Sequence, residues 1–128
     1  MLKIATTDRT TVTARIAVRD ASGEAAIVEI KLTGLLRSQP DWDALLQRHA
    51  QAEGEKVGAD VTGIYRANAK LYAEVFDGWQ GVADESGQPL AYSADALEVL
   101  LMSAHGPAAN RALMQAMHDL RYGALEKN

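Results

Sequence analysis

The chain has 128 residues, of which 48% are hydrophobic and 23% are charged, and it contains no cysteine. This size and balance are typical of one soluble globular domain with its own core, and the missing cysteine excludes disulfides, thiolate nucleophiles and cysteine-ligated zinc. A net charge of −4 with scattered basic residues argues against a nucleic-acid-binding surface, which needs clustered Lys and Arg.

Two segments near the N-terminus alternate apolar and polar residues, which is the period of a strand with one buried face. They are Thr11–Arg19 and Ala26–Thr33, and the turn residues Asp20-Ala21-Ser22-Gly23 between them predict an antiparallel hairpin. Leu2–Ala5 is compatible with a short third strand. The side chains expected to face the rest of the domain are Val12, Ile16, Val28 and Ile30.

The first predicted helix begins at Ser38, which with Asp41 resembles a capping box, and ends at Gly54. A second helix is predicted from Asp60 to about Phe76. Its apolar stripe would contain Val61, Ile64, Leu71, Val75 and Trp79.

A third helix is predicted to start at Ser93, a suitable N-cap with Asp95 in the first turn. His105-Gly106-Pro107 ends it, and Pro107 can open a last helix that Gly123 closes. The sequence thus predicts an α+β fold in a single domain, 1–128. Its parts are a hairpin at about 10–33, a helical part at about 38–123 and a charged tail at 124–128. Neither a bilayer-spanning segment nor a signal peptide is predicted.

Catalytic and metal-binding patterns are weak. His49, His105 and His118 lack the i, i+4 spacing of metal ligands, and each has an ordinary structural interpretation. The acidic residues Asp84 and Glu85 precede Gly87 as turn residues and do not match a calcium loop. We therefore expect no catalytic residue, no metal and no cofactor, and a small hydrolase or metal enzyme is the less favoured alternative.

Trp79 stands beside two glycines, which favours a structural anchor in the core over an exposed binding anchor. The leucine and methionine stripes of the last two helices are wider than one face, so either a partner or the core itself accounts for them. Under the first interpretation, the partner-binding candidates are Leu97, Leu101, Leu113 and Met117.

From Val75 onward, several motifs follow one another in a distinctive order after an apolar helix. They are Trp79-Gln80-Gly81-Val82, Asp84-Glu85-Ser86-Gly87, Tyr92-Ser93, Leu100-Leu101 and Lys127-Asn128. In this order they resemble the tail assembly chaperones of long-tailed bacteriophages and prophages. The N-terminal hairpin and the capped first helix fit the layout of that family.

The resemblance implies a non-catalytic protein of the host bacterial cytoplasm that is absent from the mature virion. Such chaperones coat the long helical tape measure protein through individually weak helix-in-groove contacts that many copies make effective. A homo-oligomer is expected on the same grounds, and neither nucleic acid nor membrane is a partner. Another virion-building factor, such as a tail completion or connector protein, is the alternative.

Overall fold

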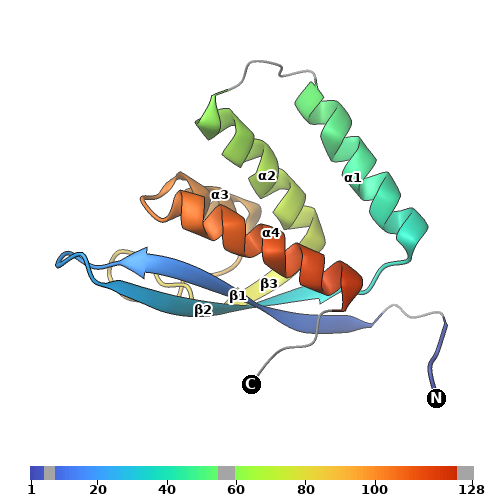
Figure 1. Cartoon of the computed structure of the whole chain (residues 1–128), viewed down its shortest axis with the longest axis horizontal. Helices are drawn as coiled ribbons and strands as arrows, with labels where there is room; N and C mark the ends of the chain where they lie inside the picture. Colours follow the sequence, from blue (N-terminus) through green and yellow to red (C-terminus); the bar gives the residue numbers. More distant parts are fainter. Residues whose placement is uncertain (5–7, 55–59, 124–128) are drawn as a thin grey trace.

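The computed structural model describes residues 1–4, 8–54 and 60–123. Its elements are, in chain order, β1 (Arg9–Arg19), β2 (Ala25–Leu35), α1 (Gln39–Gly54), α2 (Val61–Val75), β3 (Phe76–Gln80), α3 (Ala94–Met102) and α4 (Gly106–Tyr122). A three-stranded antiparallel sheet forms one layer, and the helices form a second layer on one side of it (Figure 1). The predicted α+β class is confirmed.

The sheet has the order β1-β2-β3, with antiparallel pairing throughout. The predicted hairpin is confirmed, because β1 and β2 pair from Arg9 opposite Leu35 to Arg19 opposite Ala25. The third strand is not where the sequence suggested. Leu2 to Ile4 form no strand, Ala5 lies outside the described residues, and β3 pairs with β2 instead.

The core lies between the sheet and the helices and takes side chains from every strand and helix named above. Its largest fully buried side chains include Trp42 of α1, Tyr72 of α2 and Phe76 of β3. Helix α4 faces the core with a row of buried alanines, and such small side chains allow close approach to the sheet. The buried alanines are Ala109, Ala112 and Ala116.

The caps predicted at Ser38, Ser93 and Gly123 are confirmed, whereas the third helix ends earlier than predicted, at Met102. Ser38 Oγ accepts a hydrogen bond from the Asp41 N–H, and Ser93 Oγ accepts one from the Ala96 N–H. Gly123 adopts a left-handed conformation that ends α4. The predicted charged tail, 124–128, lies outside the described residues. No helix within the described ranges is both long and apolar enough to cross a bilayer.

The predicted stripe of the second helix is wrong at both ends. Helix α2 stops at Val75, because Phe76 already has the extended backbone of β3, so Trp79 lies on a strand. Val61 and Ile64 are exposed at the other end of α2. Only Leu71 and Val75 of that stripe are buried.

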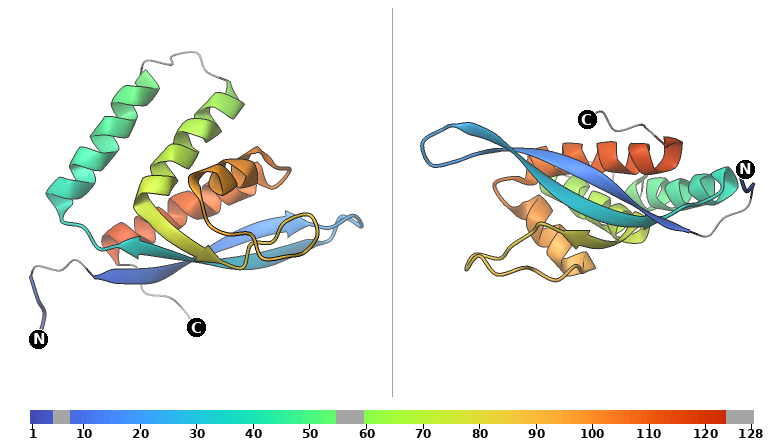
Figure 2. Two further views of the ribbon diagram at one scale, coloured as in Figure 1. Left: turned by 180° about the vertical axis from the view of Figure 1, so that it is seen from behind. Right: turned by 90° about the horizontal axis from the view of Figure 1, so that it is seen from below.

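One of the four predicted inward-facing hairpin side chains is only partly covered. Ile16 and Ile30 are buried and Val12 is partly buried, but Val28 is 41% exposed. The hairpin extends beyond the helices at its turn end, as the views from behind and from below show (Figure 2). Val28 lies near that end and is therefore left partly uncovered.

Candidate partner-binding surface

Three of the four predicted partner-binding residues are core residues. Leu97, Leu101 and Leu113 are 0%, 1% and 0% exposed, and Met117 is partly buried against the same core. The sequence interpretation was wrong here because α2, α3 and α4 cover one another, so the domain does bury these wide stripes. A partner surface must consist of other residues.

Trp79 is partly buried and packs against the core. Its indole Nε1 donates a hydrogen bond of 2.8 Å to the carbonyl oxygen of Leu90. Its ring meets the ring of Tyr92 edge to face at 5.2 Å between centroids. The fully buried tryptophan is Trp42, at 1% exposure.

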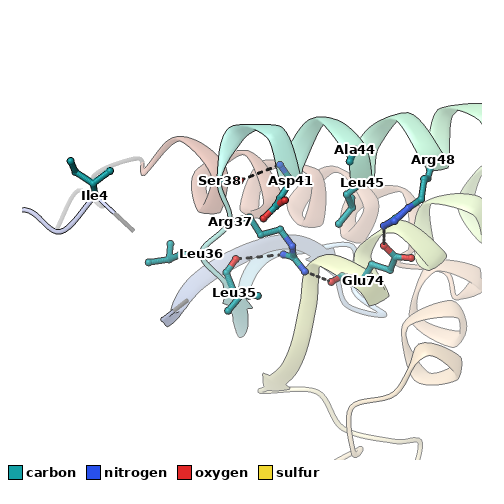
Figure 3. A pocket seen from close by; sticks show the side chains of 10 residues that line it. All are labelled: Ile4, Leu35, Leu36, Arg37, Ser38, Asp41, Ala44, Leu45, Arg48 and Glu74. Atoms are coloured by element: carbon teal, nitrogen blue, oxygen red, sulfur yellow. Dashed lines mark hydrogen bonds and ion pairs between the residues drawn. The ribbon is translucent and has the colours of Figure 1, made fainter. Parts of the chain in front are cut away.

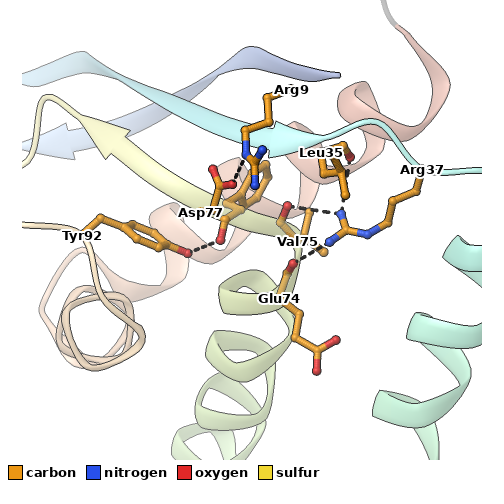
Figure 4. A network of polar contacts seen from close by, with 8 residues as sticks. Arg9, Leu35, Arg37, Glu74, Val75, Asp77 and Tyr92 are labelled. Atoms are coloured by element: carbon orange, nitrogen blue, oxygen red, sulfur yellow. Dashed lines mark hydrogen bonds and ion pairs between the residues drawn. The ribbon is translucent and has the colours of Figure 1, made fainter. Parts of the chain in front are cut away.

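Tyr92 connects the segment that precedes α3 to the end of α2. Its hydroxyl donates a hydrogen bond of 2.6 Å to the carbonyl oxygen of Phe76 (Figure 4). Burial, together with the negative charge of Asp77, raises the pKa of Tyr92 to about 12. Asp77 itself forms an ion pair with Arg9 of β1. Strand β3, the loop after it and the start of α3 are thus joined by aromatic and polar contacts.

The loop after β3 is a tight turn, with Ala83 bridging to Pro89. Asp84 Oδ1 accepts hydrogen bonds from the backbone N–H groups of Ser86 and Gln88 and from the Ser86 hydroxyl. These contacts, the hydroxyl first, lower the pKa of Asp84 below its usual value. Gly87 has a φ of +83°, which favours glycine.

The hairpin between β1 and β2 ends in a turn of the same construction. Asp20 Oδ1 accepts hydrogen bonds from the N–H groups of Ser22 and Glu24 and from the Ser22 hydroxyl. The bond from the Ser22 hydroxyl is the main cause that lowers the pKa of Asp20 below its usual value. The segments 20–24 and 84–88 read Asp-Ala-Ser-Gly-Glu and Asp-Glu-Ser-Gly-Gln. A turn was predicted at each place, but the likeness between the two segments was missed.

A cleft lined by both apolar and charged side chains lies between α1 and the end of α2, with a volume of about 590 Å³ (Figure 3). Three of its four charged side chains, those of Arg37, Arg48 and Glu74, make contacts within the fold. Arg37 donates to the carbonyl oxygens of Leu35, Val75 and Glu74, with the last bond at 2.8 Å (Figure 4). Arg48 pairs with the Glu74 carboxylate at 2.8 Å. These groups hold α1, α2 and β2 together, which is a structural task.

A second depression is largely apolar and lies between the hairpin and α3. It consists of two adjoining hollows of about 390 and 630 Å³ that share Val82, Ala83, Leu100 and His105. We call it the hairpin–α3 groove. Each of its main apolar side chains is partly or largely exposed. They are Val18, Val28, Val82, Leu90, Val99 and Leu100.

The histidines lie apart in the fold. His49 lies on α1 with its Nε2 at 3.6 Å from the Glu74 carboxylate, and His118 on α4 contacts the ring of Tyr122. His105 precedes α4 at the edge of the groove. Across the described ranges, no three His, Cys, Asp or Glu side chains gather as metal ligands would.

Comparison of the chain with protein-family models, with curated proteins and with solved structures gives no match.

Proposed function

We propose that this protein is a phage tail assembly chaperone that binds and solubilises the tape measure protein during tail morphogenesis. The observation that carries the proposal is that three of the five distinctive motifs, at Trp79, Asp84 and Tyr92, lie in one closed segment of the fold. Trp79, Leu90 and Tyr92 join the end of β3 to the start of α3, with the Asp84 turn between them. Residues that carry the resemblance to tail assembly chaperones, Trp79 and Tyr92 among them, therefore also contact one another in the folded protein.

The surface chemistry supports the same proposal. A chaperone for a long helical protein needs exposed apolar surface that can cover the apolar faces of its partner. The hairpin–α3 groove offers such a surface, with Val99 64% and Val28 41% exposed. We therefore place the partner-binding site in the groove and not at the buried Leu97, Leu101 and Leu113.

Binding at one groove is expected to be weak, because an assembly chaperone must release its partner when tube subunits arrive. Many copies along one tape measure protein would make the coat effective through high local concentration. We therefore also propose that the protein acts as several copies, in the host cytoplasm, and that it leaves before the virion is complete.

Two experiments test this function. Co-expression with the tape measure protein of the same gene cluster should yield a complex that co-purifies through a tag on either chain. Mass spectrometry of purified virions should then lack the chaperone while detecting the tape measure protein. Presence of the chain in virions at a fixed copy number would instead indicate a tail completion or connector protein.

A further inference from the structure

The hairpin–α3 groove has an acidic rim around an apolar floor. Asp20 lies at the hairpin end, Asp84 and Glu85 in the loop after β3, and Asp95 in the first turn of α3. The cationic side chain among the lining residues is Arg19, whose Nη1 donates to the Gly23 carbonyl. With four carboxylates against one guanidinium, the surroundings of the groove favour a positively charged occupant.

Two of these carboxylates are held in place by the folded chain. Asp20 and Asp84 each accept three hydrogen bonds within matching turns, and these bonds favour the ionised form. The hairpin end and the loop after β3 extend on either side of the α3–α4 connection in the view from below (Figure 2). The groove thus carries a fixed negative charge on each of its two walls.

The lining of the groove also bears on the form of the occupant, because it consists mainly of aliphatic and carboxylate side chains. The backbone of α3 is paired within the helix, and β2 pairs with β1 along its length but with β3 only from Lys31 to Gly34. A strand added to a sheet gains affinity from unpaired edge groups, whereas a helix satisfies its own backbone and contributes only side chains. An apolar floor suits the second kind of ligand.

We propose that the hairpin–α3 groove binds an amphipathic helix whose apolar stripe is flanked by Lys and Arg. The identification of the tape measure protein as the source of that helix rests on the proposed function. The shape and charge of the groove do not. Apolar side chains of the helix contact Val28, Val82 and Val99, and its basic side chains lie against the acidic rim.

The probes are two synthetic helical peptides of about five turns, with leucines along one stripe. One has lysines beside the stripe, and its twin has glutamates there. The test variants are Val99→Asn and Glu85→Lys, since Glu85 is exposed and Val99 is 64% exposed. The matched controls are Val61→Asn, at 62% exposure on α2, and Glu29→Lys, on the outer face of the sheet.

We expect the wild-type protein to bind the lysine peptide at least about tenfold more tightly than its glutamate twin. Val99→Asn should weaken binding about fivefold, as loss of a valine contact does. Glu85→Lys should weaken it by a similar factor that shrinks as salt is added. Both controls should bind like the wild type.

Equal binding of the two peptides, or test variants that behave like their controls, would overturn the proposal. So would a groove variant that dissociates a homo-oligomer while neither peptide binds, because the groove would then be a contact between copies. Co-purification with the tape measure protein separates the two levels. If it persists in both groove variants, the chaperone function stands and the groove is wrong. If it fails in the wild type while the lysine peptide binds, the groove stands and the partner is wrong.

Discussion

The indole Nε1 of Trp79 donates its hydrogen bond to the carbonyl oxygen of Leu90, 2.8 Å away and 11 residues later in the chain. This bond closes the loop that carries the Asp84 turn. It also places Leu90 at the edge of the hairpin–α3 groove. Trp79 therefore helps to position the loop whose residue Leu90 lines the proposed binding surface.

Trp79 and Trp42 provide a graded test of burial. Trp42→Ala should lower the free energy of unfolding by about 3–5 kcal/mol, as expected for a fully buried aromatic side chain. Trp79→Ala should cost less because Trp79 is only partly buried. Trp79→Phe should cost about 1 kcal/mol through the lost hydrogen bond. Urea unfolding measures all three, and a larger effect of Trp79→Ala than of Trp42→Ala would contradict this order.

Tyr92 should make stability depend on alkaline pH. Its pKa in the folded protein is about 12, above the usual value of 10.0, so the folded state favours the neutral phenol. This contribution is complete below about pH 10 and is lost as the pH rises towards 12. In a titration followed by tyrosinate absorbance, Tyr92→Phe should remove the ionisation step near pH 12. It should also cost about 1 kcal/mol by deleting the bond to Phe76.

The titration of Tyr92→Phe is compared with that of the wild type under conditions where both remain folded. If the increase in tyrosinate absorbance between pH 10 and 12 is the same in the wild type and in Tyr92→Phe, Tyr92 is not the residue with the raised pKa.

Gly106 is required by sterics at the corner between α3 and α4. A Cβ at this position would overlap the backbone carbonyl oxygen of Leu101, which cannot move without disturbing the end of α3. Gly106→Ala should therefore destabilise the protein by about 1–3 kcal/mol. Gly78→Ala is the control, because its Cβ would lie 4.0 Å from the nearest atom, on Thr33. Thermal melts of equal midpoint for the two variants would contradict this explanation.

The hairpin and the helix caps could be predicted because both depend on local signals. Alternation over Thr11–Arg19 and side chains such as Ser38 and Ser93 act on their own neighbourhood. Strand β3 could not be predicted in this way, since Phe76–Gln80 is a strand only because β2 lies beside it. Its five residues continue the apolar pattern of α2, which suggested a longer helix.

The burial of Leu97, Leu101 and Leu113 also depends on tertiary packing, so it cannot be read from the apolar stripe of a helix in the sequence. The stripe shows that a face is apolar, and only the arrangement of α2, α3 and α4 decides what covers it. The acidic rim of the groove, in contrast, has a local signal in the sequence. Asp-x-Ser-Gly occurs at both Asp20 and Asp84, and this repeat is typical of two matching acidic turns.

We propose above all that this chain keeps a long helical partner soluble. The most direct measurement is the soluble fraction of the tape measure protein of its own gene cluster, expressed with and without this chain. We expect a several-fold larger soluble fraction with the wild-type chain and a smaller gain with Val99→Asn than with Val61→Asn. A soluble fraction that is the same with and without the wild-type chain would contradict the chaperone function.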